Sequence, residues 1–459
     1  MKILILGASQ VGVSIAEVLV GEDNDVTLVD VNSHTLQQLQ DRLDIRTVCG
    51  NAAHPTVLRN AGAEDASLVL AVTNSDEVNL VACQIADNIF ATPTKIARLR
   101  SKEYLNNSEL FTGDSGFKVD VLISPEQIVR DHIARLIEFP GASQVLDFAD
   151  GLVQLVGVKA VSGGALIGHP LTELKQHMPG VETRVAAIYR GGDVIMPKSD
   201  TIIQEKDEVF FVAARQHIRQ VMNEMRGKSD KTKRIFIAGG GNIGLNLALE
   251  LERKGYSVKL IEYNSERAEL IAERVENTIV LNGDAADASL LLQENIENCD
   301  VFCAVTERDE INILSAKLAK ELGAKRVMAL VNKAAYVENL VHLDINAIIS
   351  PRTATIGSVL AHIRRGDVVA VHALRRGRAE AIEAIAHGDE NSSKVIGKGV
   401  RDIPFAQGTG VGAIVRDEQV IIPHASTVIE AEDHVIVFID DKASIADVEA
   451  LFEVDVTFL

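Results

Sequence analysis

Gly7-Ala8-Ser9-Gln10-Val11-Gly12 follows the apolar run Ile3–Leu6, and Asp30 closes a second apolar run 23 positions after the first glycine. A glycine-rich turn between a strand and a helix, with an acidic residue about twenty residues further on, is typical of a Rossmann-type dinucleotide site. The glycines let a pyrophosphate approach the backbone, and the helix N-terminus offers it unpaired N–H groups. The acidic residue is placed to accept hydrogen bonds from a ribose. The stretch therefore predicts a nucleotide-binding α/β domain.

The same pattern occurs a second time in the chain. Gly239-Gly240-Gly241-Asn242-Ile243-Gly244 follows the apolar run Ile235–Ala238, and Glu262 lies 23 positions after the first of these glycines. The two turns and the two acidic residues are both 232 positions apart, so the repeat has kept its register. A dehydrogenase needs one such site per chain, whereas two sites favour a sensor.

Short β-branched runs alternate with helical patterns in both copies. In the first copy we expect strands near residues 2–6, 26–30, 46–49, 68–72, 95–99 and 120–123, and the alternation recurs from about 234 to 350. This order predicts an α/β protein with two tandem Rossmann-like domains, each built on a doubly wound parallel sheet.

A helix is expected after each copy, because Ser124-Pro125 and Ser350-Pro351 are typical of a helix start. Both helices have apolar residues on more than one face, so each needs two surfaces to pack on. Ordinary burial within the chain and docking on a partner domain or subunit both satisfy this pattern, with docking slightly favoured.

A smaller pattern repeats after each of these helices at a spacing of 226 residues. Ala187–Arg190 recurs as Ala413–Arg416, and Gly191-Gly192 and Asp417-Glu418 lie at expected hairpin turns. Each repeat therefore predicts a small α+β domain rich in strands. The polar stretch Arg226–Lys233 between the halves is the expected linker.

The candidate ligand-binding residues lie at the carboxyl edges of the two predicted sheets. They are Gly7, Ala8, Ser9, Gln10, Val11, Asp30, Thr73, Asn74 and Arg98 in the first copy, and Gly239, Gly240, Gly241, Asn242, Ile243 and Glu262 in the second. Thr306 and Asp284 are secondary candidates in the second copy.

The two sites are expected to differ in affinity or in ligand. Ser9 stands where the second copy has Gly241, and its side chain narrows the approach of a phosphate to the backbone. Arg98 is placed to neutralise a phosphate or to stack on adenine, and its counterpart is Val331. Both carboxylates would repel the 2′-phosphate of NADP, so NAD(H) is the expected cofactor.

The bulk composition excludes several classes of partner. The 459 residues suggest roughly three or four domains. A net charge of −19, 4% aromatic residues and no tryptophan argue against nucleic acid. No apolar run reaches the roughly 18 residues needed to cross a bilayer, and residues 3–6 are better explained as a buried strand than as a signal peptide. We therefore expect a cytoplasmic or peripheral protein. Cys299 and Cys303 are expected as buried thiols, with no metal site.

With both turns, the T-x-x-D-E-x-N segments at Thr73–Asn79 and Thr306–Asn312 and the doubled small lobes, the chain closely resembles the TrkA family. These are the peripheral nucleotide-binding subunits of bacterial Trk potassium uptake systems. The resemblance covers essentially the whole length. It implies RCK N-lobes at 1–123 and 234–349, connecting helices at 124–140 and 350–366, RCK C-lobes at 141–226 and 367–459, and a linker at 227–233.

The resemblance also implies a function without chemistry. A homotetramer ring on the cytoplasmic face of the inner membrane would bind NAD(H), with ATP or ADP as further ligands, and control potassium flux through a membrane Trk-type potassium-conducting subunit. The family's binding positions carry over to Gly7 through Val11, Asp30, Thr73, Asn74 and Arg98, and to Gly239 through Ile243 with Glu262.

Two other functions remain open. The chain is also compatible with a regulatory subunit of another cation channel or of an antiporter, since such modules look alike without their membrane partner. An NAD-dependent dehydrogenase is less favoured, because no His, Lys or Tyr with a carboxylate partner recurs at equivalent positions in the two halves.

Overall fold

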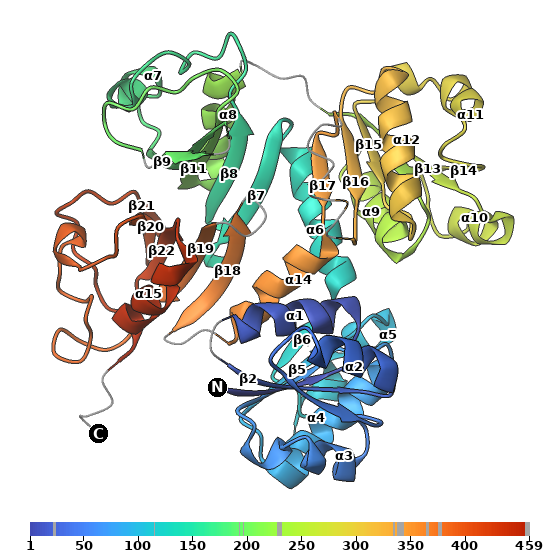
Figure 1. Ribbon diagram of the computed structural model, residues 1–459. Coiled ribbons are helices and arrows are strands. Elements are labelled where there is room, and N and C mark those ends of the chain that lie inside the picture. Colours follow the sequence, from blue (N-terminus) through green and yellow to red (C-terminus); the bar gives the residue numbers. More distant parts are fainter. Residues whose placement is uncertain are drawn as a thin grey trace. The chain divides into compact units, whose positions relative to one another are not determined.

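The computed structural model describes residues 1–21, 24–113, 115–191, 193–195, 197–226, 232–333, 336, 344–363, 367–374 and 379–454 (Figure 1). The chain divides into two compact units, Met1–Ile128 with Pro351–Ile363 and Val129–Ser350 with Arg364–Leu459. Several predicted features lie partly outside the described residues: 227–231 of the linker, 364–366 of the second connecting helix, Gly192 of one turn, and 375–378 and 455–459 of the second small domain. Among the described helices, none is long and apolar enough to cross a bilayer.

The first Rossmann-like lobe is a parallel six-stranded sheet with helices. Its strands are β1 (Lys2–Leu6), β2 (Asp25–Asp30), β3 (Arg46–Cys49), β4 (Leu68–Ala71), β5 (Thr94–Arg98) and β6 (Val121–Ile123). Its helices are α1 (Gln10–Val20), α2 (Ser33–Gln40), α3 (Pro55–Asn60), α4 (Asp76–Phe90) and α5 (Lys102–Leu105). The strand order is β3-β2-β1-β4-β5-β6. β4 is buried along its whole length, as expected of a central strand in a parallel sheet covered on both faces.

The second Rossmann-like lobe repeats this architecture. Its strands are β12 (Arg234–Ala238), β13 (Ser257–Glu262), β14 (Ile279–Asn282), β15 (Val301–Ala304), β16 (Val327–Leu330) and β17 (Ala347–Ile349). Its helices are α9 (Asn242–Arg253), α10 (Ser265–Ala272), α11 (Ala288–Gln293) and α12 (Asp309–Glu321). The order β14-β13-β12-β15-β16-β17 is that of the first lobe, strand for strand.

In both lobes the strand order reverses beside the first strand. The chain builds outward from β1 through β2 to β3 and then returns to β4 on the other side of β1. Ligands of open parallel sheets bind at the carboxyl ends of the strands, where the order reverses. Gly7 directly follows β1, and Gly239 directly follows β12, so both glycine turns lie at this point. The predicted pair of Rossmann-like parallel sheets is confirmed.

Two antiparallel lobes complete the fold. The first C-lobe contains β7 (Ala142–Phe148), β8 (Val153–Lys159), α7 (Leu174–His177), β9 (Thr183–Arg190), β10 (Asp193–Ile195), β11 (Glu208–Ala214) and α8 (Ile218–Arg226). The second C-lobe contains β18 (Val368–Leu374), β19 (Ala379–Ile385), β20 (Thr409–Arg416), β21 (Gln419–Ile421), β22 (His434–Ile439) and α15 (Ile445–Phe452). The orders β10-β9-β11-β8-β7 and β21-β20-β22-β19-β18 are equivalent, which confirms the two small α+β lobes.

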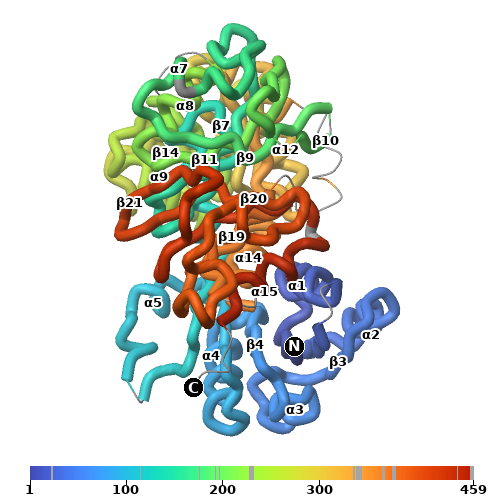
Figure 2. Tube along the Cα trace, turned by 90° about the vertical axis from the view of Figure 1, so that its left-hand side faces the viewer, coloured from blue at the N-terminus to red at the C-terminus, as the bar shows by residue number. Residues whose placement is uncertain are grey.

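The two C-lobes share one hydrophobic core. Phe148 and Phe210 of the first lobe belong to the same buried cluster as Leu374 and Phe438 of the second. Figure 2 shows the green trace of the first C-lobe against the red trace of the second. Backbone and side-chain bonds cross the boundary, for example from Arg184 Nη1 to a carbonyl of β20 at 2.6 Å. The small domains of the two halves are therefore one packed body.

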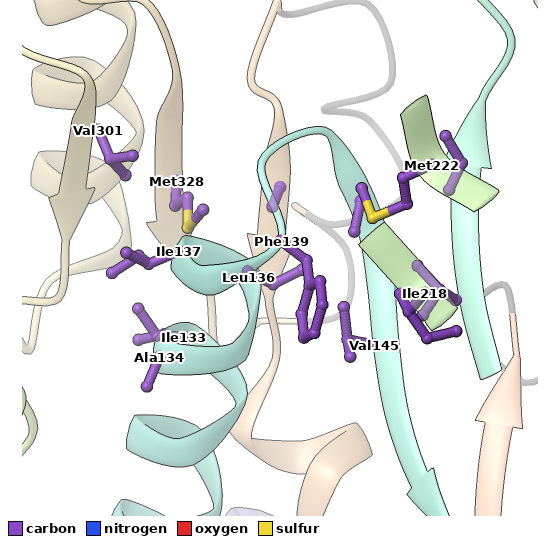
Figure 3. Packing of buried hydrophobic residues seen from close by; sticks show 14 of the residues in the cluster. Ile133, Ala134, Leu136, Ile137, Phe139, Val145, Ile218, Met222, Val301 and Met328 are labelled. Carbon is purple, nitrogen blue, oxygen red and sulfur yellow. The ribbon is translucent and has the colours of Figure 1, made fainter. Parts of the chain in front are cut away.

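The helix α6 (Pro125–Glu138) begins at the proline where the sequence predicts a start. Its later turns pack in two directions (Figure 3). Ile137 lies on the side of the strands that carry Val301 and Met328 of the second Rossmann-like lobe, and Phe139, just beyond the helix, lies near Val145 of the first C-lobe. The two apolar faces of this helix are thus both buried within the chain, one against the second Rossmann-like lobe and one against the first C-lobe.

The helix α14 (Pro351–Leu360) follows the second Rossmann-like lobe and packs on the first one. It packs against α1 and β6 of the first Rossmann-like lobe, and Arg352 forms an ion pair with Glu17 of α1. Each Rossmann-like lobe is therefore covered by the helix that follows the other one. Both helices therefore pack within the chain, each against a Rossmann-like lobe of the other half.

Candidate functional site

Both turns require glycine at their first position. Gly7 has a φ of +111° and Gly239 a φ of +105°, which L side chains rarely adopt. A Cβ on Gly7 would also lie 2.8 Å from the backbone nitrogen of Thr73, and one on Gly239 would lie 2.9 Å from that of Thr306. The chain can pass this close to the end of the neighbouring strand only without a side chain.

The last glycine of each turn brings the helix onto the turn. A Cβ on Gly12 would lie 2.1 Å from the carbonyl oxygen of Gly7, and one on Gly244 would lie 1.9 Å from that of Gly239. The first turns of α1 and α9 consequently start directly at the carboxyl edge of the sheet. Their N-terminal amides are the groups that bind phosphate in this type of site.

The two acidic residues are held in the same way. Asp30 accepts the backbone N–H of Ala8 at 2.6 Å and that of the second residue after itself at 2.8 Å. Glu262 accepts the N–H of Gly240 at 2.8 Å and that of Asn264 at 2.9 Å. A carboxylate has about four acceptor positions, so each keeps free positions for the hydroxyl groups of a ribose.

The two turns differ at their third position, which is Ser9 in the first copy and Gly241 in the second. The Ser9 hydroxyl accepts the N–H of Gly12 at 3.4 Å and donates to the carbonyl of Val72 at 3.0 Å, so it caps α1. Gly241 begins α9 with no side-chain cap, and a Cβ there would meet nothing within 4 Å. An amide of the second site is therefore left for a ligand where the first site uses its own serine.

The remaining turn candidates lie in the first turns of the helices. Gln10 and Asn242 are exposed, whereas Val11 and Ile243 are half-buried. The secondary candidate Asp284 is exposed and accepts the N–H of Ala286 at 2.9 Å, so its carboxylate shapes its own loop.

Thr73 lies two residues after the end of β4, where the buried Asn79 holds it. Asn79 accepts both the N–H of Thr73, at 2.9 Å, and its hydroxyl, at 2.7 Å, and donates to the carbonyl of Arg98 at 2.9 Å. Asn312 makes the equivalent bonds to Thr306, at 2.8 and 2.7 Å. The threonines are therefore bound inside the protein, and Asn74, the next residue, is exposed at the same edge.

Buried aspartates stabilise the loops after the fifth strands. Asp76 accepts the N–H of Arg100 at 2.9 Å and that of Ser101 at 2.7 Å, while Asp309 accepts that of Lys333 at 2.8 Å. The sequence reasoning matched these segments between the copies but gave their Asp and Asn no role. The same Asp and Asn recur 233 positions apart in the two copies, and this recurrence could have indicated a structural role. Polar side chains that are buried need hydrogen-bond partners, which these residues find in the neighbouring loops.

Arg98 is almost fully buried at the end of β5, with 6% of its surface exposed. Its Nη2 lies 4.0 Å from Glu126 Oε1, and its Nε is buried without a hydrogen-bond acceptor among the described residues. Burial, and secondarily the charge of Arg100, lower the pKa of the Arg98 guanidinium. A buried cation with an unused donor is suited to an anionic group. The counterpart Val331 is a buried apolar residue, so this feature exists in the first copy alone.

Two exposed residues at this edge were missed by the sequence reasoning. Val31 and Tyr263 directly follow the acidic residues and are 71% and 79% exposed. They occupy equivalent positions, 232 residues apart, beside the carboxylate at the carboxyl edge of each sheet. Arg267 Nε also donates to the carbonyl of Gly240 at 3.0 Å, which adds a cation to the second site alone, since its counterpart is Thr35.

The expectation of buried thiols fits Cys299 and Cys303, which are both buried. Burial raises the pKa of the Cys299 thiol to about 12 and also raises that of Cys303. A thiol that stays protonated is a poor metal ligand.

Models of two domain families match the chain twice each. The TrkA-N domain matches residues 3–125 and 235–351, and the TrkA-C domain matches residues 155–226 and 389–453. The matches therefore follow the two halves of the repeat.

Curated relatives match over the full length. The Trk system potassium uptake protein TrkA of Halomonas elongata is 56% identical over 458 residues, and that of Vibrio alginolyticus is 54% identical over 459, each with 100% of both chains covered. The protein of the same name from Haemophilus influenzae is 45% identical over 459 residues, again with 100% of both chains covered.

Solved structures share the fold at low identity. The crystal structure of the GsuK RCK domain has a TM-score of 0.61 at 17% identity, covering 98% of this chain and 94% of that one. The GsuK channel bound to NAD has a TM-score of 0.61 at 18% identity, covering 98% and 79%.

Proposed function

The chain belongs to the TrkA family, and from this membership we propose that it is the nucleotide-sensing subunit of a Trk-type potassium uptake system. NAD(H) binds at both glycine turns, ATP or ADP are further ligands, and the bound nucleotide controls potassium flux through a membrane subunit. The three full-length relatives described above are named as Trk system potassium uptake proteins, and in this proposal the chain binds nucleotides without carrying out a reaction on them. The observation that carries the proposal is the duplicated bond between a turn amide and an acidic residue.

The residues of the second turn fit a dinucleotide. The uncapped amides at the start of α9 would hold the pyrophosphate, Glu262 the ribose hydroxyls, and Tyr263 the face of the adenine. NAD(H) supplies a nicotinamide ring that exists in two oxidation states, and in this role the protein only distinguishes them. The GsuK channel, which shares the fold, is known in an NAD-bound form.

The first turn also fits a nucleotide, but it offers fewer free amides and an additional cation. Asp30 keeps acceptor positions for a ribose, whereas Ser9 occupies one amide of α1. Arg98 offers its buried and unpartnered Nε to a phosphate. The first site therefore relies on a cation, which suits the more highly charged phosphates of ADP or ATP.

In this proposal, the free energy needed for gating explains why the chain has two nucleotide sites and why several chains assemble. Moving a gate from mostly closed to mostly open requires about 5.5 kcal/mol of differential binding, whereas one allosteric coupling typically contributes about 1–3 kcal/mol. Several sites in a homotetramer ring, each with a modest preference for one state, would together reach this value. A ring of this kind would lie on the cytoplasmic face of the membrane, against its potassium-conducting partner.

Apolar side chains on equivalent helices support self-association. Val81 on α4 is 40% exposed and Leu314 on α12 is 59% exposed, and the two positions are 233 residues apart in the repeat. We infer that these two residues, exposed at the same place in both copies, contact the Rossmann-like lobes of neighbouring chains in the ring.

Potassium uptake in cells tests the proposal. A strain lacking this chain is complemented with the wild type, with an Asp30→Asn/Glu262→Gln double variant, or with Asp44→Asn as an exposed-acid control. We expect uptake to be lost in the deletion strain, restored by the wild type and the control, and poorly restored by the double variant. Normal uptake without the chain, or full restoration by the double variant, would overturn the proposal.

The alternative client, another channel or an antiporter, is separated by co-purification from membranes. We expect a Trk-type potassium-conducting protein to travel with the chain. Recovery of an antiporter or a ligand-gated channel instead would keep the sensor role and change its client.

A further inference from the structure

We propose that the first C-lobe carries a binding site for a divalent transition-metal cation, formed by His169, Glu173 and His177. One donor atom of each residue lies within 4.8 Å of the other two, the one such cluster among the described residues. The site lies outside both nucleotide turns and uses residues that neither the fold nor the proposed function requires.

The contacts bring the three side chains to one point. His169 Nδ1 and Glu173 Oε2 are 2.8 Å apart, and the rings of His169 and His177 meet edge to face with centroids 5.1 Å apart. Glu173 ends a 3₁₀ turn, Leu171–Glu173, and His177 ends α7, so these two residues, four apart, share one side of a short helical segment, while His169 lies just before the turn. The side chain of His177 makes no hydrogen bond to other described residues, and its ring nitrogens are therefore available as ligands.

The distances are compatible with an inserted ion. Zinc bonds to nitrogen and oxygen of about 2.0–2.2 Å in a tetrahedral site place the donor atoms roughly 3.3 Å apart. The histidine–carboxylate pair would open by about half an ångström, and the widest separation would close by at most about 1.5 Å, which rotamer adjustments of the exposed His169 and the half-buried Glu173 and His177 supply. Two imidazoles and a carboxylate are donors that zinc and its neighbours accept, and the fourth position stays open to water.

The segment that carries the ligands is fixed by the fold. The N–H of Leu171 donates to the carbonyl of Thr201 at 3.0 Å, and that of Thr172 donates to Ser199 at 2.9 Å. Met178, directly after the last ligand, is buried. The backbone is therefore held before an ion binds, and only side-chain freedom is lost on binding.

The second C-lobe provides an internal comparison. There the N–H of Val400 donates to the carbonyl of Thr427 at 2.9 Å, in the place of the Leu171 bond. This match aligns His169 and Glu173 with Lys398 and Asp402, and residues 403–408 contain no histidine. A lysine in place of a ligand repels a cation, so the site exists in the first C-lobe alone.

The chain also offers a matched control. His387 Nδ1 and Glu432 Oε1 are 2.8 Å apart, the same separation as in the proposed site, without a third donor in reach among the described residues. A single histidine–carboxylate pair holds an ion weakly, so substitution of His387 should not affect metal binding. Cys49 is the exposed thiol of the chain and is replaced by serine in all proteins tested, because a thiolate would compete for zinc.

The test is a Zn²⁺ titration of the metal-free full chain in competition with a chromophoric chelator. We compare the Cys49→Ser parent with His169→Gln, Glu173→Gln, His177→Gln and His387→Gln in that background. We expect one Zn²⁺ per parent chain, a loss of affinity in each ligand variant beyond the roughly 10–100-fold typical of outer-shell changes, and no loss in H387Q. Absorption of bound Co²⁺ should report a tetrahedral site that the ligand variants lack.

Two results would overturn the proposal. One is a parent chain that binds Zn²⁺ no more tightly than the His169→Gln and His177→Gln variants. The other is equal loss of binding in the H387Q control. Circular dichroism and thermal unfolding of the metal-free proteins show whether the variants fold, and Zn²⁺ should raise the melting temperature of the parent but not of His177→Gln.

Discussion

Glu262 Oε2 accepts the backbone N–H of Gly240 at 2.8 Å, and this bond joins the second glycine turn to the end of β13. The first copy repeats the bond between Ala8 and Asp30 at 2.6 Å. A carboxylate at the end of the second strand therefore orients the turn that follows the first strand. Because the same atom pair recurs in both copies, a change at the acid is expected to alter the turn as well as the ribose contact.

The first glycine of the second turn is expected to be essential for stability. Gly239→Ala combines a φ of +105° with an overlap on the backbone of Thr306, whereas Gly255→Ala has a φ of +80° and open space around its Cβ. We expect Gly239→Ala to lower the free energy of unfolding by about 1–3 kcal/mol more than Gly255→Ala. Denaturant unfolding of the full chain measures the difference, and equal losses would show that the close approach to Thr306 is not a constraint.

The serine cap should set the difference between the sites. Gly241→Ser fits without a clash and adds the cap that Ser9 provides in the first copy. We expect it to weaken NADH binding at the second site by roughly two- to tenfold, the range of one hydrogen bond of about 0.5–1.5 kcal/mol. Ser9→Gly should strengthen binding at the first site. Calorimetry with NADH on each variant is the measurement, and unchanged affinities in both would exclude the cap as the cause.

The exposed aromatic ring beside Glu262 should contribute to nucleotide affinity. Tyr263→Ser removes a side chain that is 79% exposed, while Leu270→Ser removes an apolar one on α10 that is 55% exposed. We expect Tyr263→Ser to weaken NADH and ADP binding about fivefold or more, since stacking of a base on an aromatic ring contributes about 1–3 kcal/mol. The Leu270→Ser control should bind normally. A Tyr263→Ser protein with wild-type affinity would place the adenine elsewhere.

Stability should decrease on mild acidification because of His132 in α6. Burial, with the charges of Arg135 and His372, lowers the pKa of His132 to about 4. The unfolded chain binds this proton at an ordinary pKa of about 6.5, so the folded state loses stability as pH falls from about 6.5 toward 4. We expect the drop in melting temperature between about pH 7.5 and 5.5 to be smaller in His132→Gln than in the wild type or in the exposed control His424→Gln. An equal drop in all three would contradict this assignment.

Much of the fold was predictable from the spacing of the repeat. The strands expected near 2–6, 46–49 and 68–72 were found as Lys2–Leu6, Arg46–Cys49 and Leu68–Ala71, since buried strands of parallel sheets form clear β-branched runs. The helices after Pro125 and Pro351 were also predictable, as was the need of the first of them for two surfaces. Which lobe each helix covers was not, because an apolar face does not encode the identity of its partner.

The main residues of the candidate site could be predicted from the sequence, whereas their hydrogen bonds and burial could not. Gly7, Gly239, Asp30 and Glu262 follow from motif spacing, but the capping role of the Ser9 hydroxyl depends on a backbone carbonyl at position 72. The buried state of Arg98 likewise depends on Glu126 and on the strands around it. His169, Glu173 and His177 could not be grouped from sequence, because neither a long helix nor a known motif marks the short segment that brings them together.

The central claim is that the two glycine turns of one chain bind nucleotides and act as switches. Calorimetric titration of the full chain with NADH tests it most directly. The wild type should bind two NADH per chain, and Asp30→Asn and Glu262→Gln should each remove or severely weaken one of the two binding events while the other remains. A chain that binds no NADH, or one whose two variants bind it like the wild type, would contradict the account.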